Sequence, residues 1–252
     1  MSKLSAVIIT LNEEKNIARA IESLQGVVDE IVIMDSFSTD NTVQVCKDLG
    51  CEVYQQKWLG YSGQKNKANS MAKHPFILSL DADEALSDRL KKEIIQAKSS
   101  GLAGTYSFNR LTQYCGHWVK HGGWYPDVKV RIFPKDKTSW AGEFVHETLE
   151  FSEDLSNTHL SGDLLHYSYY NYSEHRERAD HYSALTAQKM FARGKKAGPL
   201  KPFLSAFARF MGMYFFKGGI LDGKMGFMIA WISAQSNHFK YTELKRLHRE
   251  KA

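Results

Sequence analysis

The sequence predicts an α/β fold in which a mostly parallel sheet is flanked by helices and followed by a helical C-terminal appendage. In the first hundred residues, short apolar runs alternate with segments whose apolar residues recur at helical spacing. Such alternation is typical of βαβ units, whose successive strands are parallel. Expected strands span residues 4–10, 30–34, 51–55 and 76–80, and expected helices span 14–24, a segment ending near 49, 62–72 and 86–99.

The second half has a different texture. Residues 106–111, 129–133 and 164–170 look like strands, and an irregular segment rich in Gly, His, Trp and Tyr separates the first two. From about Ser173 the pattern becomes helical. We therefore expect a first domain over residues 1–170, with halves of about 1–100 and 101–170, and a helical region over 171–252.

The most informative stretch is the apolar run 76–80, which ends at Asp81-Ala82-Asp83-Glu84. Carboxylates are costly to bury unpaired, and parallel strands end in the crevice where α/β sheets bind ligands. Hard oxygen ligands there suit Mg²⁺ or Mn²⁺, as a diphosphate-binding enzyme would require. The alternative is a solvated turn that caps the next helix, for which Ser87 is the expected N-cap.

Composition limits the class of protein. Three cysteines, Cys46, Cys51 and Cys115, give neither a disulfide framework nor a paired metal spacing, which favours a reducing cytoplasm. The short run 4–11 is expected to be a strand and not the core of a signal peptide. No glycine-rich phosphate loop is present, so a nucleotide site would depend on carboxylates and metal.

The net charge of +5 is unevenly distributed. Residues 190–252 carry 12 Lys and Arg against 3 Asp and Glu, whereas the rest of the chain is mildly acidic. The longest charge-free run in this tail has 15 residues, 225–239, which is shorter than the ~20 that a spanning helix needs. We expect amphipathic helices on an anionic membrane surface, at the inner face of a bacterial inner membrane. A helical layer packed on the main domain would have similar composition. Binding to nucleic acid is not expected, because no nucleic-acid module is recognisable.

Four motifs occur in a recognisable order: residues 6–14 (AVIITLNEE), 35–42 (DSFSTDNT), 64–66 (QKN) and 80–84 (LDADE). Together they resemble the family 2 inverting glycosyltransferases, which have the GT-A fold. The resemblance covers roughly residues 4–150. It implies a metal-dependent transferase that uses a nucleotide-sugar donor such as a UDP-sugar.

The resemblance also assigns roles to residues. Thr10 and Asp35 would hold the nucleotide base, Glu13 would help to hold the nucleoside, and Gln64 and Lys65 would contact base and diphosphate. Lys65 could equally be an ordinary surface lysine. Asp81 would bind ribose or reach the metal through water, and Asp83 would ligate Mg²⁺ or Mn²⁺ directly.

The second half should supply the base and the acceptor pocket. Glu147, in Val145-His146-Glu147, resembles the late acidic motif of the family and is the expected catalytic base, with Glu143 in reserve. The alternative for Glu147 is an exposed strand residue. His166 resembles a late histidine that reaches the metal, although a hydrogen-bonded histidine among aromatic residues is as plausible.

Further residues could shape the acceptor site. Arg131 matches a recurrent arginine of the family, and it would either touch phosphate or brace the region of Glu147. Four aromatic residues are candidate walls of a sugar pocket, although each taken singly is better explained as a core residue. They are Trp118, Trp124, Tyr125 and Trp140.

The whole chain looks most like bacterial lipopolysaccharide core transferases that attach glucose from UDP-glucose to an inner-core heptose in β-1,4 linkage. The expected partners are therefore a nucleotide-sugar donor, a lipid-linked glycan acceptor and a membrane. Two alternatives stay open at this point. One is a transferase for another envelope glycan or a polyprenyl-lipid acceptor, and the other is a non-catalytic nucleotide-sugar binding protein.

Overall fold

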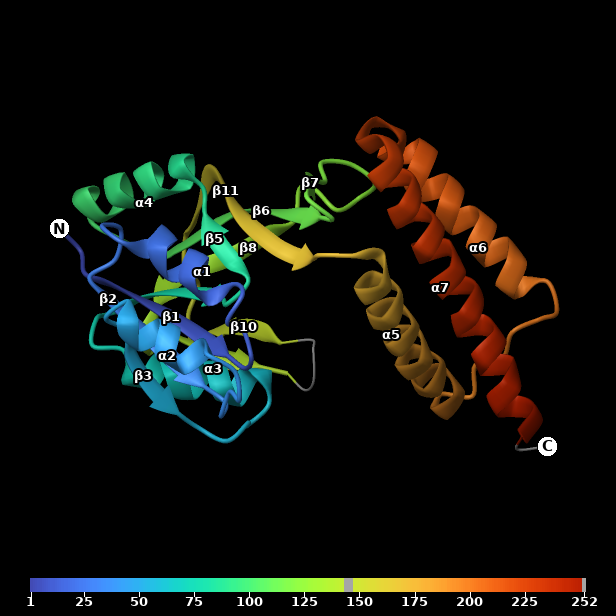
Figure 1. Cartoon of the computed structure of the whole chain (residues 1–252), viewed down its shortest axis with the longest axis horizontal. Coiled ribbons are helices and arrows are strands. Elements are labelled where there is room, and N and C mark those ends of the chain that lie inside the picture. The colour runs from blue at the N-terminus through green and yellow to red at the C-terminus, as the bar shows by residue number, and fades with distance from the viewer. Residues whose placement is uncertain (143–146, 251–252) are drawn as a thin grey trace. The chain divides into compact units, whose positions relative to one another are not determined.

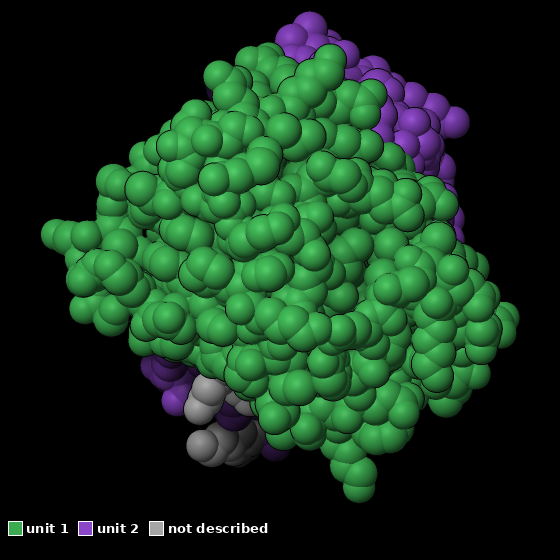
Figure 2. Space-filling model, turned by 90° about the vertical axis from the view of Figure 1, so that its left-hand side faces the viewer, with its two compact units in different colours: residues 1–110, 127–167 green, residues 111–126, 168–252 purple. Residues whose placement is uncertain are grey.

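The structure of the protein is a computed structural model that describes residues 1–142 and 147–250. The chain folds into two compact units, which are coloured separately in Figure 2. Unit 1 contains residues 1–110 and 127–167, and unit 2 contains residues 111–126 and 168–252. The expected division after residue 170 stays a prediction.

The first half of the large sheet is parallel. Its strands lie in the order β3-β2-β1-β4, and the register sets Thr10 beside Asp35 and Ile9 beside Asp81. The carboxyl ends of three strands, and the polar residues on them, therefore meet at one edge. These strands are β1 (Leu4–Thr10), β2 (Glu30–Asp35), β3 (Glu52–Gln55) and β4 (Phe76–Asp81).

The second half of the sheet contains antiparallel pairs and continues in the order β8-β6-β11-β5 (Figure 1). A separate antiparallel hairpin, β9 with β10, contains the strand that follows Glu147. The strands are β5 (Glu84–Leu86), β6 (Thr105–Tyr114), β7 (His117–Trp118), β8 (Val128–Pro134), β9 (Thr138–Ala141), β10 (Thr148–Phe151) and β11 (Asn157–Tyr169), with a short turn, η1 (Lys135–Lys137), before β9.

Apolar side chains cover both faces of the parallel strands. Along β1, Ala6 and Ile8 pack into one core and Val7 and Ile9 into the other, as the two-residue period of a strand requires. The first core includes apolar residues of α1, α2 and α4, and the second includes Ala68 of α3. The helices are α1 (Ile17–Leu24), α2 (Thr42–Asp48), α3 (Tyr61–Met71) and α4 (Asp88–Ser100).

The helices of unit 2 form one layer in which α5 and α6 flank α7 (Figure 1). Tyr114 and Val119 pack with Met213, Ile229 and Ala230 in the core of this unit. Within the described residues, no helix is both long enough and apolar enough to cross a bilayer. The elements are α5 (Tyr172–Ala192), α6 (Lys201–Met211), η2 (Gly212–Phe216), η3 (Gly219–Asp222) and α7 (Gly223–Glu250).

The structure bears out the α/β class with a helical C-terminal region, excludes one alternative and corrects the start of one helix. Glu84 does not lie in a solvated turn, because it begins a buried strand, and the following helix therefore begins at Asp88 and not at Leu86. Ser87 caps this helix as expected, since its hydroxyl accepts a hydrogen bond from the N–H of Leu90 at 3.3 Å. The three cysteines are free, and burial raises the pKa of the Cys46 thiol to about 12.

Candidate functional site

The ends of β1 and β2 hold the residues expected to bind a nucleotide base. Asp35 is fully buried, and its carboxylate accepts hydrogen bonds from the backbone N–H of Ser38 at 3.0 Å and from Nε2 of Gln55 at 3.2 Å. The Ser38 hydroxyl also donates to it, at 2.5 Å. Asp35 therefore fixes the loop after β2, and a base would have to share its carboxylate with these donors.

Thr10 and Gln64 offer free hydrogen-bonding atoms at this edge. Both side chains are buried, and neither Thr10 Oγ1 nor Gln64 Oε1 has a partner among the described residues. The Gln64 amide is oriented by its other end, since Nε2 donates to Oγ of Ser36 at 3.0 Å. Buried polar atoms without partners are uncommon in native proteins. These two atoms fit a polar ligand such as a nucleoside.

Glu13 is tied to the beginning of α1. Its carboxylate accepts from Nδ2 of Asn16 at 2.8 Å, and its backbone N–H donates to Oγ1 of Thr42 at 2.8 Å. Both contacts connect the β1–α1 loop to a helix N-terminus. Glu13 therefore already has a structural role in positioning this loop.

Asp81, at the end of β4, is held between two cations. Its Oδ1 lies 3.1 Å from Nζ of Lys65 and its Oδ2 lies 2.9 Å from Nη2 of Arg131. Burial by itself would raise the pKa of Asp81, but the guanidinium of Arg131 and the ammonium of Lys65 outweigh it and hold that pKa well below its usual range. The two cations thus favour the ionised form of the Asp81 side chain.

Asp83 and His166 come together because β5 pairs with β11. The register sets His166 opposite Glu84, and Nε2 of His166 lies 3.2 Å from Oδ2 of Asp83. A carboxylate oxygen and an imidazole nitrogen are a suitable donor pair for Mn²⁺. Within the described residues, no group of three or more His, Cys, Asp and Glu side chains is arranged to hold a metal. The other ligands of an ion here would come from water and the substrate, as is usual for Mg²⁺ sites.

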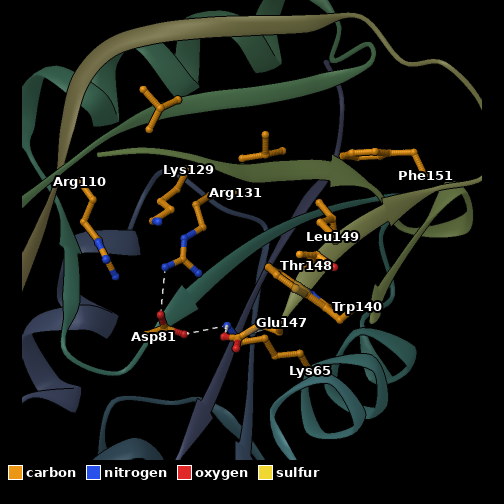
Figure 3. A pocket seen from close by; sticks show the side chains of 12 residues that line it. Lys65, Asp81, Arg110, Lys129, Arg131, Trp140, Glu147, Thr148, Leu149 and Phe151 are labelled. Carbon is orange, nitrogen blue, oxygen red and sulfur yellow. Dashed lines mark hydrogen bonds and ion pairs between the residues drawn. The ribbon is translucent and has the colours of Figure 1, made fainter. Parts of the chain in front are cut away.

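A pocket of about 510 Å³ opens beside Asp81 (Figure 3). Lys65 is buried in its wall, with Nζ 4.6 Å from the ring centroid of Trp140 and 3.3 Å from Oε1 of Glu147. This burial argues against an ordinary surface lysine. One ammonium thus joins Asp81 to Glu147, a residue from the second half of the chain. The lining is Lys65, Asp81, Arg110, Val128, Lys129, Val130, Arg131, Trp140, Glu147, Thr148, Leu149 and Phe151.

Of the four aromatic residues expected around a sugar, only Trp140 lines this pocket within the described part of unit 1. Trp124 instead packs edge-on against Tyr114, with ring centroids 5.7 Å apart, in the core of unit 2. Trp118 and Tyr125 also belong to unit 2. Aromatic character alone could not show which of these residues line the pocket and which belong to unit 2. Glu143 and His146 lie outside the described residues.

The sequence interpretation gave no role to two charged residues of the pocket region, Glu84 and Arg110. Glu84 is fully buried, 2.6 Å from Nη2 of Arg131, and it also accepts the N–H of Asp81 at 3.0 Å. Arg110 lines the pocket, and its Nε and Nη2 lie 2.9 and 2.8 Å from Oδ2 of Asp127. For Arg110, the available signal was a charged residue inside an aromatic strand of the second half.

Comparison with known proteins identifies a family for this chain. Residues 5–160 match the family described as Glycosyl transferase family 2. An uncharacterized glycosyltransferase of Rickettsia typhi is 32% identical, over 98% of this chain and 88% of that relative. Lipopolysaccharide core biosynthesis glycosyltransferase LpsC of Rhizobium meliloti is 30% identical, over 99% of this chain and 94% of that relative. The solved structure of S. aureus TarS in complex with UDP-GlcNAc is 16% identical, over 99% of this chain and 92% of that chain, with a TM-score of 0.47.

Proposed function

Because this chain belongs to glycosyl transferase family 2, we propose that it is a metal-dependent inverting enzyme that moves glucose from UDP-glucose to an inner-core heptose of lipopolysaccharide. One observation carries the proposal furthest. Glu147 and Asp81 both lie within 3.3 Å of the Lys65 ammonium, which supports a base on the same edge as the donor site.

The donor would lie across the ends of β1, β2 and β4. Thr10, Asp35 and Gln64 would hold the uracil, and the free Oγ1 and Oε1 atoms support this assignment. Glu13 would help to hold the nucleoside from the β1–α1 loop, and Asp81 would take the ribose. Lys65 would reach the diphosphate.

A divalent cation, Mg²⁺ or Mn²⁺, would be held by Asp83 and His166. Their 3.2 Å approach supports this pair as ligands. When bound, the ion supplies positive charge that stabilises the leaving diphosphate. The Lys65 ammonium, which lies 3.1 Å from Oδ1 of Asp81, would add to that charge.

Glu147 would act as the general base. Its carboxylate takes the proton of the acceptor hydroxyl as that oxygen attacks the anomeric carbon of the donor. The bond between the anomeric carbon and the phosphate oxygen breaks, and its electron pair leaves with UDP. Because attack comes from the face opposite the leaving group, the configuration inverts. Arg131, which binds Asp81 and Glu84, is a positioning residue in this scheme.

The acceptor assignment is supported by the relative named a lipopolysaccharide core biosynthesis glycosyltransferase, which matches this chain along nearly its whole length. We assign residues 1–170 to catalysis and residues 171–252 to membrane association. The enzyme would act in the cytoplasm, at the inner face of the inner membrane. Accumulation of product on polyprenyl phosphate, and not on a lipid-A core, would favour the alternative acceptor.

Glu147→Gln tests the base most directly. Transfer of glucose to core acceptor should fall by about 10²- to 10⁴-fold, the usual contribution of a general base. Asp83→Ala should likewise abolish transfer. The readouts are UDP release in vitro and mass analysis of core oligosaccharide from a deletion strain that carries each variant.

Glu153→Gln is the matched control. Glu153 follows the same hairpin and pairs only with exposed Lys137 among its described contacts, so transfer should stay at the wild-type level. Each variant should unfold at the wild-type temperature. Unchanged turnover in Glu147→Gln or in Asp83→Ala would refute the respective role. UDP binding without any metal-dependent turnover would identify a binding protein.

A further inference from the structure

Unit 2 exposes an unusual set of apolar side chains. Among the described residues, the large apolar side chains that are more than 60% exposed are Met1 and six residues between positions 200 and 221. Four of them, 62–67% exposed, belong to the beginning of α6 and the residue before it. The six are Leu200, Phe203, Leu204, Phe207, Phe216 and Leu221.

The four residues at α6 form one stripe, which we call the α6 face: Leu200, Phe203, Leu204 and Phe207. Their spacing of three and four residues sets them on one side of a helix. Ser205, on the opposite side of α6, accepts a hydrogen bond from Nδ2 of Asn237 of α7 at 2.6 Å, and Phe210, near the edge of the stripe, has its ring 5.7 Å from that of Phe227. At the edge of the stripe the Phe203 ring contacts His238 of α7, with ring centroids 4.9 Å apart, whereas Leu204 and Phe207 are 62% and 67% exposed.

The charge around the α6 face has a single sign. No Asp or Glu occurs between residues 181 and 221, a stretch that contains seven Lys and Arg. Lys201 and Arg209 are exposed on α6 itself, and Lys217 is exposed immediately after Phe216. Exposed aromatic and leucine side chains beside lysine and arginine are the composition of a helix that lies in the interface of an anionic bilayer.

We propose that the α6 face is a membrane-binding surface that inserts into the headgroup region of an anionic lipid bilayer. Leu204 and Phe207 enter the boundary between headgroups and acyl chains, and Lys201, Arg209 and Lys217 contact lipid phosphates. The proposal deepens the proposed function by naming the residues that hold the enzyme on its acceptor membrane. It concerns binding alone, so it stands or falls independently of sugar transfer.

Co-sedimentation of the full-length protein with vesicles tests the proposal. The wild type should bind vesicles that contain phosphatidylglycerol and should bind phosphatidylcholine vesicles far less. The double variant Leu204→Gln/Phe207→Gln should lower the partition coefficient by about tenfold or more, because it removes two inserting side chains without changing the core. Ile95→Gln, which changes an exposed apolar residue of α4, should bind like the wild type.

A charge-reversal variant distinguishes binding through lipid phosphates from binding through apolar side chains. Lys201→Glu/Arg209→Glu should reduce binding to phosphatidylglycerol vesicles by about tenfold or more, and added salt should weaken wild-type binding in the same direction. Lys92→Glu, at an exposed position of α4, is the control for charge reversal. Wild-type binding by Leu204→Gln/Phe207→Gln would overturn the proposal. A second result would also overturn it: the wild type binds neither kind of vesicle and sediments as a dimer, and Leu204→Gln/Phe207→Gln sediments as a monomer. In that case a second copy of the chain would cover the α6 face.

Discussion

At the scale of single residues, the site depends on a buried guanidinium shared by two carboxylates. Nη2 of Arg131 lies 2.9 Å from Oδ2 of Asp81 and 2.6 Å from Oε1 of Glu84. Glu84 has no exposed surface, whereas Asp81 is one-third exposed and faces the pocket. Glu84 thus holds Arg131 from the buried side. Arg131 in turn holds the carboxylate of Asp81, which a substrate in the pocket would meet.

Glu84→Ala should destabilise the protein by about 2–4 kcal/mol, because the buried guanidinium of Arg131 loses one of its two carboxylates and the N–H of Asp81 loses its acceptor. Urea unfolding measures the change. Asp88→Ala is the control: Asp88 is 93% exposed and 3.5 Å from Lys91, so its removal should cost less than about 1 kcal/mol. Equal losses in the two variants would mean that Glu84 contributes no more than a surface carboxylate.

Residue types at strand ends could be predicted from local sequence, whereas their pairing could not. Asp81 and Asp83 follow an apolar run, which is a local signal. Glu84 was missed because a three-residue strand gives no periodicity, and its arginine partner lies 47 residues away. Whether Lys65 is an ordinary surface lysine was likewise decided by its ion pairs with Asp81 and Glu147. The residues next to Lys65 in the sequence do not predict these pairs.

At the scale of elements, close packing of α7 on η3 requires a glycine. A Cβ atom on Gly226 would lie 1.8 Å from the carbonyl oxygen of Gly219, so Gly226→Ala must separate the two elements. We expect a loss of about 1–3 kcal/mol, typical of overpacking. Fluorescence-detected urea unfolding, in which Trp231 reports on α7, measures it.

Gly212→Ala is the matched control for this prediction. Gly212 has helical dihedral angles, and a Cβ there would meet nothing within 4 Å. Alanine should therefore be neutral or stabilising by up to about 1 kcal/mol. If Gly226→Ala were as stable as Gly212→Ala, the close approach of α7 to η3 would be wrong.

The N-terminal part of α5 carries a buried histidine that makes stability depend on pH. Nδ1 of His175 lies 2.9 Å from the Tyr114 hydroxyl, and burial, with the nearby charge of Arg178, lowers the pKa of His175 to about 4. In the unfolded chain its pKa is about 6.5. Between these values the unfolded state binds the proton first, so stability falls as the pH decreases from 6.5 to 4.

His175→Phe should remove this dependence. Between pH 7 and pH 4 the free energy of unfolding of the wild type should decrease by up to about 3 kcal/mol more than that of the variant. Urea unfolding at several pH values gives both slopes. Parallel slopes would show that His175 does not titrate between folded and unfolded states in this range.

Element types were predictable, but their long-range pairing was not. The alternating apolar and helical segments of the first hundred residues predicted β1 to β4 and their helices. The meeting of Asp83 with His166 depends on β5 pairing with β11, which are separated by more than seventy residues. For Asp83 and His166, family resemblance supplied the expectation, and strand pairing supplies its physical cause.

At the scale of the whole molecule, each unit is built from two separate segments of the chain. Residues 111–126, which include the end of β6 and all of β7, pack with the C-terminal helices through Tyr114 and Val119. A change of composition along the sequence marks one boundary, so it could not reveal a segment that crosses between units. It did predict the helical, basic character of the C-terminal region.

The central claim concerns one place, where the parallel strands end. A crystal of the protein soaked with UDP-glucose and Mn²⁺ tests it most directly. The account predicts the uracil beside Asp35 and Thr10, the ion on the Asp83 carboxylate and the His166 imidazole, and the sugar facing Glu147. An ion that lies away from Asp83, or a nucleotide bound elsewhere on the protein, would contradict it.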